Sequence, residues 1–311
     1  RRILKGRQEL ADFALFESSE YQPIKSLIIR PGLRYAYNTT YQTPLLPSLN
    51  VKWNFFSDWN LRASYARGFR APGIKELYFE FIDINHNIVG NDELGAESSH
   101  NFQASLNRRW RKEKVIIKTE LSAFYNSIKD RISLASITGT EFTYVNIGSF
   151  KSNGIRLNAG LEHKNLNFNA GTAIIGRASD FVSSEVANTF IYYPEIQTSS
   201  IYTIKQTSTS LAVFYKYQGK LPNFSVNSDG EIQQVITEDY HLLDFTITQK
   251  LWKDRLTLTM GSKNILNVTQ VVSGGAGGGA HSASSNAVSV GNGRSYFASL
   301  KIHLSKRLKS N

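Results

Sequence analysis

The segment His241-Leu242-Leu243-Asp244-Phe245-Thr246-Ile247-Thr248-Gln249-Lys250-Leu251 alternates between apolar and polar side chains with a period of two. In an extended chain Leu243, Phe245 and Ile247 fall on one face, and the polar side chains between them fall on the other. The stretch 256–263 that follows shows the same alternation. The two segments together predict a pair of β-strands with one apolar and one polar face.

The same alternation recurs along the chain, and helical periodicity is scarce. The best helical stretch is Gly73–Phe81, and it is short. We therefore expect an all-β protein. The sequence predicts about thirteen strands, at 9–20, 26–38, 45–55, 60–69, 100–110, 115–126, 143–162, 166–176, 193–205, 209–219, 238–250, 255–267 and 294–304.

The joints between these strands alternate between short and long. A soluble sandwich with Greek-key crossings has no reason to sort its loops in this way, whereas outer-membrane barrels have tight turns at the periplasmic end and long extracellular loops. The short joints are 57–59, 111–114, 164–165, 206–208 and 252–254, and the long joints are 70–99, 127–142, 177–192, 220–237 and 268–293.

Composition fits a barrel and excludes several other classes. The 311 residues are 41% hydrophobic and 20% charged, so disorder is not expected. Mean hydropathy is −0.29, and no run of apolar residues is long enough for a membrane-spanning helix. The absence of cysteine excludes disulfides, thiolate catalysis and cysteine-ligated metals. A formal net charge of +11 suits an anionic partner.

Two further features bear on a membrane barrel. Trp59, Trp110 and Trp252 lie in or beside short joints, where an interfacial aromatic belt is expected. The strand number is odd, and an open sheet would leave two unpaired edges. We therefore expect residues 1–304 to be the C-terminal portion of a larger barrel, or one chain of a split one. The basic residues 305–311 form a separate tail.

Several motifs follow this strand order. The strand at 60–69 leads into Phe69-Arg70-Ala71-Pro72, and the long loop returns through Asn91, Leu94 and Glu97. Further on, Lys263-Asn264-Ile265-Leu266-Asn267 ends one strand and Gly293-Arg294-Ser295-Tyr296-Phe297 starts the last. Together they resemble the signature series of TonB-dependent outer-membrane receptors over residues 50–304. Asp92 stands where the family usually has proline, and the last strand lacks the usual terminal aromatic residue.

The resemblance implies a 22-stranded antiparallel barrel in the outer membrane of a Gram-negative bacterium, with an N-terminal plug that contacts the TonB complex. This chain shows neither plug nor TonB box. The implied partners are the TonB complex through that missing plug, the N-terminal half of the barrel, outer-membrane lipid and a surface lipoprotein. The implied function is active uptake of a scarce nutrient, with haem expected first, cobalamin second and an iron siderophore as the alternative.

The haem expectation centres on the loop 70–99. The resemblance implies that an extracellular histidine, here His86, ligates the iron, with Tyr78 and Phe79 able to stack on the macrocycle. The plain alternative is that 82–87 is a polar loop. His281 follows a glycine run that lacks the features of a phosphate loop. It is either a second axial ligand or, more simply, a solvated residue.

No resident cofactor, catalytic constellation or nucleic-acid motif is evident, so an enzyme is not expected. A passive barrel acting as a porin, an adhesin or a docking platform stays open, as does a soluble β-rich binding domain. A continuous outward apolar band would exclude the soluble domain. Basic side chains at polar alternation positions are expected to line the barrel lumen: Lys52, Arg62, Lys118, Arg156, Lys216 and Lys263.

Overall fold

The computed structural model describes residues 6–82, 87–138, 141–179, 189–226, 232–252, 254–272 and 287–303. Within them, thirteen antiparallel strands follow one another in a single sheet, each hydrogen-bonded to the next. In order they are β1 Asp12–Ser18, β3 Leu27–Asn38, β4 Leu46–Phe56, β5 Trp59–Arg70, β8 Glu97–Lys112, β9 Val115–Thr138, β10 Glu141–His163, β11 Leu166–Ser179, β12 Ile191–Ile204, β13 Thr209–Gln218, β16 Tyr240–Leu251, β17 Leu256–Lys263 and β20 Ser295–Ile302.

The remaining elements are short and lie outside the main path of this sheet. Three of its strands lie off the main path, and two small hairpins lie apart from it. No helix of the described residues is long and apolar enough to cross a membrane. The short elements are β2 Tyr21–Ile24, α1 Ile74–Tyr78, β6 Glu80–Ile82, β7 Asn87–Val89, β14 Leu221–Val226, β15 Ile232–Thr237, β18 Gln270–Val272 and β19 Ala287–Ser289.

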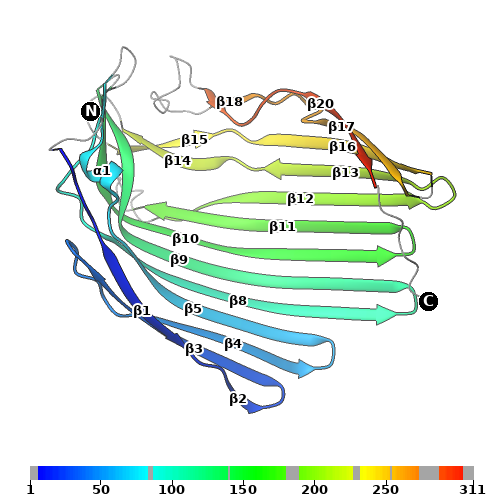
Figure 1. The fold of residues 1–311 in the computed structure, drawn as a ribbon, viewed down its shortest axis with the longest axis horizontal. Coiled ribbons are helices and arrows are strands. Elements are labelled where there is room, and N and C mark those ends of the chain that lie inside the picture. Colours follow the sequence, from blue (N-terminus) through cyan, green and yellow to red (C-terminus); the bar gives the residue numbers. More distant parts are fainter. Residues whose placement is uncertain are drawn as a thin grey trace.

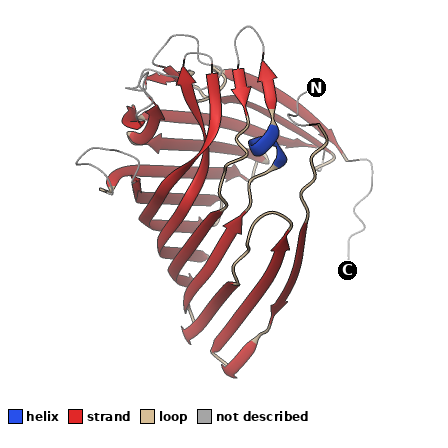
Figure 2. Ribbon diagram, turned by 90° about the vertical axis from the view of Figure 1, so that its left-hand side faces the viewer, coloured by secondary structure: helices blue, strands red, loops and turns tan. Residues whose placement is uncertain are grey.

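The sheet curves into a trough, and its connections are sorted by length (Figures 1 and 2). The tight β4–β5, β8–β9, β10–β11, β12–β13 and β16–β17 turns all lie at one end, on the right in Figure 1. Helix α1 and hairpin β14–β15 lie at the opposite end. The described parts of the connections therefore separate as a membrane barrel requires, because each strand must cross the whole apolar layer.

One segment that the sequence predicts to be a loop, residues 127–142, mostly forms β-strand. The alternation pattern predicts a long joint at 127–142, but β9 continues to Thr138 and β10 begins at Glu141. The two strands stay paired from Val115 and His163 up to that end. Alternation alone could not show this, because a hairpin that rises above a membrane no longer needs an apolar face.

Strand register gives the sheet two chemically different faces. Across β4, β5, β8, β9 and β10 one row of paired residues reads Trp53, Leu61, Leu106, Leu121 and Leu157. Rows of this kind continue to β20, where Leu258 pairs with Leu300. The outward apolar band is thus continuous, and many of its members are well exposed. This excludes the soluble-domain alternative, because a soluble protein does not expose such a band.

The sheet is open in the described residues. β1 pairs only with β3, and β20 pairs only with β17. All seven residues of β1 and all eight of β20 are exposed. Each edge therefore presents a row of unpaired backbone groups, as a portion of a larger barrel would.

Candidate functional site

The connection between β5 and β8 folds over the long-loop end of the sheet. Helix α1 starts at Ile74, two residues after Pro72, and β7 adds to β10 as a parallel strand. Backbone bonds fasten the returning segment to the outgoing one: the amide of Asn91 donates to the carbonyl of Glu76 at 2.9 Å, and that of Gly90 donates to Phe79 at 2.7 Å. A side chain at Gly90 would lie 2.7 Å from the backbone of Leu77. Only glycine permits this approach.

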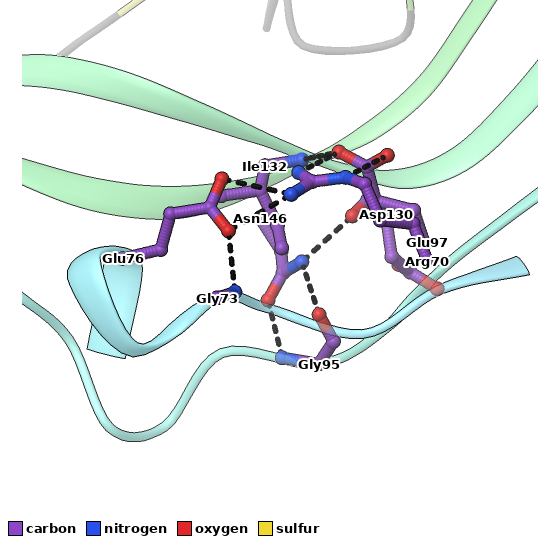
Figure 3. A network of polar contacts seen from close by, with 8 residues as sticks. All are labelled: Arg70, Gly73, Glu76, Gly95, Glu97, Asp130, Ile132 and Asn146. Carbon is purple, nitrogen blue, oxygen red and sulfur yellow. Dashed lines mark hydrogen bonds and ion pairs between the residues drawn. The ribbon is translucent and has the colours of Figure 1, made fainter. Parts of the chain in front are cut away.

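An ionic clamp holds this connection at its base (Figure 3). Arg70, the last residue of β5, donates two parallel hydrogen bonds to Glu97, the first residue of β8, at 2.9 and 2.7 Å. Its Nη1 also donates to both carboxylate oxygens of Glu76 on α1, at 2.9 and 2.8 Å. Arginine suits this position because its planar group can serve two carboxylates at once.

Each carboxylate of the clamp also accepts a hydrogen bond from a backbone amide. Glu76 accepts from Gly73 at 2.7 Å, which caps the short helix, and Glu97 accepts from Ile132 of β9 at 2.7 Å. Burial raises the pKa of Glu97, but the hydrogen bonds from Arg70 and Ile132, together with the positive charges nearby, outweigh burial and lower it overall. The Glu97 carboxyl is therefore more readily ionised in the folded rim than in the unfolded chain.

Asn146 of β10 extends this polar network to the neighbouring pair of strands, β9 and β10 (Figure 3). Its side-chain amide donates to the carbonyls of Gly95 and Asp130 at 3.0 and 2.7 Å, and its oxygen accepts from the amide of Gly95 at 2.7 Å. Sequence reasoning missed Asn146 and Glu76. The capping position of Glu76 gave a usable signal, since it lies three residues after Gly73; nothing near Asn146 did.

A small apolar core lies under the clamp. Leu77, Leu94 and Ile132 are 2%, 3% and 8% exposed and contact one another, and Pro72 is also fully buried. Asn91 closes the turn before Leu94: its side chain donates to the carbonyl of Tyr144 at 2.9 Å. The motif residues Arg70, Pro72, Asn91, Leu94 and Glu97 therefore meet in one structural unit, where Phe69 and Ala71 contribute half-buried backbone positions.

The two aromatic residues predicted to stack on a macrocycle are already engaged. Tyr78 packs against the rim core. The ring of Phe79 is stacked on that of Phe81 with 6.1 Å between centroids, and the Lys75 ammonium lies 5.1 Å from the Phe79 centroid. Their role toward a ligand stays a prediction. His86 and His281 lie outside the described residues.

The second motif pair forms another polar junction at the same end. Asn264, just after β17, is buried and adopts a left-handed backbone with φ of 50°. Its side-chain amide donates to the carbonyls of Val268 and Asn292 at 2.8 and 2.9 Å. Nearby, the amide of Arg294 donates to the side chain of Asn267 at 2.9 Å. This junction ties the exit of β17 to the start of β20.

The concave face encloses a hollow of about 1250 Å³. Its charged lining contains six basic residues and three acidic ones. Two of the basic side chains, Arg108 and Lys118, are ion-paired with Asp58 and Glu162 outside this lining, so the cationic excess of the hollow is small. Four of the basic residues predicted to face the lumen, Lys118, Arg156, Lys216 and Lys263, line it. The other lining charges are Arg108, Arg109, Glu120, Glu195 and Asp244. In the part of the chain that the structure describes, no three His, Asp or Glu side chains converge on a metal-sized site.

Curated sequences of similar proteins match parts of the chain. The ferrienterobactin receptor of Escherichia coli K12 is 27% identical over 105 residues, covering 30% of this chain and 14% of that receptor. The iron-regulated outer membrane virulence protein of Vibrio cholerae is 27% identical over 123 residues, covering 39% of this chain and 18% of that protein. The matches thus span less than a fifth of these relatives.

Solved structures with a similar fold cover nearly all of the chain. The FrpB iron transporter from Neisseria meningitidis superimposes with a TM-score of 0.67 at 18% identity, over 94% of this chain and 45% of that one. The ferric enterobactin receptor PfeA from Pseudomonas aeruginosa, in complex with enterobactin, gives the same four values. The chain therefore spans less than half of these structures.

A family profile decides membership. The profile described as TonB dependent receptor-like, beta-barrel, matches residues 4–265, which is most of the chain. The order of strands, the sorting of turns and loops and the two motif junctions agree with it. The family consists of outer-membrane receptors and not of enzymes. The chain belongs to the TonB-dependent receptor family and forms part of its transmembrane β-barrel.

Proposed function

We propose that this chain forms wall, lumen and extracellular loops of a receptor that imports an iron–siderophore complex with energy from TonB. The observation that carries the proposal is the cationic hollow, with six basic against three acidic lining residues. Many siderophores bind iron through anionic oxygen donors, so their iron complexes carry negative charge. A cationic lumen attracts such complexes and raises their local concentration.

The names of similar proteins support the same ligand class. The relatives and structures described above are named for ferric enterobactin or for iron. The expectation of haem or cobalamin depends on His86, Tyr78, Phe79 and His281. Two of these lie outside the described residues, and the other two are occupied by contacts within the rim. The proposal therefore moves from a tetrapyrrole to a siderophore.

The proposal assigns the rest of the receptor to sequence outside this chain. The unpaired edges of β1 and β20 would join further strands, and a plug inside the completed barrel would contact TonB. Carboxylates of the plug would pair with part of the cationic lining. The long-loop end, with the Arg70 clamp, would face the exterior.

Binding of ferric enterobactin to the full receptor tests the proposal. We expect quenching of intrinsic fluorescence on titration, with affinity reduced about tenfold in an Arg156→Ala, Lys216→Ala double variant because two lumen charges are lost. Lys301→Ala, which removes a cation at the β20 edge away from the hollow, serves as the matched control. Haemin binding with a Soret shift, and no response to the ferric siderophore, would contradict the proposal in favour of a tetrapyrrole.

A further inference from the structure

The outward surface of β4, β5, β8 and β9 carries an apolar groove that neither the clamp nor the lumen uses. Its volume is about 490 Å³. The floor consists of Val51, Ala63, Ala104 and Ala123, which pair across the four strands in a single row. The rows above and below have larger side chains, so the floor lies lower than its two walls. The groove lies across the strands, within the apolar band of the barrel.

An aromatic wall separates this groove from the extracellular end. Tyr65, Phe102 and Tyr125 form the next row of paired residues and line the groove. Their ring centroids lie 4.8 Å apart for Tyr65 and Phe102, and 6.5 Å apart for Phe102 and Tyr125. Aromatic rows of this kind mark the interface between the hydrocarbon layer and the headgroups. The groove therefore lies at acyl-chain depth, directly below the headgroup level of the outer leaflet.

Basic side chains follow at headgroup level. The next row contains Arg67, His100 and Lys151, and the row beyond it contains Lys129. The hydroxyl of Tyr65 lies 3.0 Å from Nδ1 of His100, which joins the groove wall to the row that contains Arg67 and Lys151. Across β5, β8, β9 and β10 neither row contains an acidic residue. Nε of Arg67 is buried and has no hydrogen-bond partner among the described residues.

We propose that this surface binds an acylated lipid with a phosphate headgroup from the outer leaflet of the outer membrane. One acyl chain lies in the groove over the alanine floor, and the phosphate lies against Arg67, His100 and Lys129. Arginine is well suited to this place, because its fork binds phosphate oxygens in pairs. The inference depends on the position of the barrel in the membrane and not on the transported ligand.

Lipid retention by the full receptor tests the charged half of the site. The receptor is reconstituted in nanodiscs of zwitterionic phospholipid, titrated with lipid A and analysed by native mass spectrometry. We expect Arg67→Ala with Lys129→Ala to weaken lipid A binding by about fivefold per charge removed, and Arg67→Lys to restore most of the loss at its position. Arg62→Ala, on the same strand but facing the lumen, is the matched control. Equal binding by the double variant and the control would overturn the proposal.

Filling the groove tests the apolar half. Ala104→Phe raises the floor and should release lipid A, while Val213→Phe, an outward position of β13 away from the groove, should not. Migration as a folded barrel in unheated gels confirms that each variant is assembled. Unchanged lipid A binding by Ala104→Phe would reject the site. Displacement of lipid A by inorganic phosphate alone would also reject it, since the basic side chains would then bind a free anion.

Discussion

At the scale of single residues, Arg70 is the centre of the rim at the long-loop end of the sheet. It joins the end of β5, helix α1 and the start of β8 through four hydrogen bonds. The Arg70 side chain is 45% exposed, so solvent screens its ion pairs and the net stabilisation is modest. The main effect of the clamp is geometric, because it fixes both ends of the β5–β8 connection at one point.

Replacing Arg70 by alanine should loosen the loop without unfolding the barrel. We expect a cost of roughly 1–2 kcal/mol in the local stability of the rim, because Glu97 and Glu76 lose their shared partner. A spin label at Ile82→Cys, 62% exposed on β6, would report this as increased mobility. Arg62→Ala is the control. A spectrum identical to wild type would show that the rim core alone holds the loop.

Acid should loosen the same clamp through Glu97. Its pKa is lowered in the folded rim, so the folded state binds this proton less readily than the unfolded chain does. The stabilisation is therefore complete above the ordinary value of 4.5 and is lost as pH falls through the lowered pKa. The Ile82 label should gain mobility in strong acid, and Glu97→Gln should show that mobility already at neutral pH. A pH-independent spectrum in both proteins would contradict this.

Among the polar residues of the second junction, Asn264 should be the one whose substitution lowers stability most. Asn264→Ala removes two donated bonds and one accepted bond from a buried site and places alanine at a left-handed φ. We expect a loss of about 2–4 kcal/mol in the free energy of unfolding. Urea denaturation of the reconstituted receptor measures it, with the exposed Asn292→Ala as control, because Asn292 contributes only its carbonyl. Equal midpoints would mean that water replaces the lost bonds.

At the scale of elements, the longest hairpin should project from the cell surface. β9 and β10 contain 24 and 23 residues, about twice what a tilted strand needs to cross the membrane. A cysteine at Ser133 should therefore react with an impermeant maleimide on intact cells, and one at Glu113, in the β8–β9 turn, should not. Labelling at Glu113 alone would invert the topology.

Sequence alone could predict the elements better than the site. Alternation located all thirteen strands of the main path, because membrane strands must be apolar on one face throughout. It failed at 127–142, where β9 and β10 leave the membrane and that requirement ends. The clamp was only half predictable. Arg70 and Glu97 stood out as motif residues, but Asn146 did not, because its bonds to the backbone of Gly95 and Asp130 join segments distant in sequence and depend on the register of β9 and β10.

At the scale of the whole molecule, the two open edges set a requirement for assembly. Unpaired ladder groups in hydrocarbon cost several kcal/mol each, so β1 and β20 need partner strands in a membrane. Residues 1–311 expressed alone should fail to give a heat-modifiable monomeric barrel in unheated gels. Supplying the missing strands as a second chain should restore it. A closed barrel formed by residues 1–311 alone would contradict the open sheet.

The clamp also bears on how such receptors diversify. Because Arg70 and Glu97 fasten the two ends of the β5–β8 connection together, the chain between them starts and finishes at neighbouring points, whatever its length. Closing a flexible loop of double length costs only about 0.6 kcal/mol more. Insertions between Ile82 and Asn87 are therefore expected to leave the register of the wall beneath unchanged. Natural variation at this point can proceed independently of the wall, and a protein engineer can graft new sequence there with little risk to the barrel.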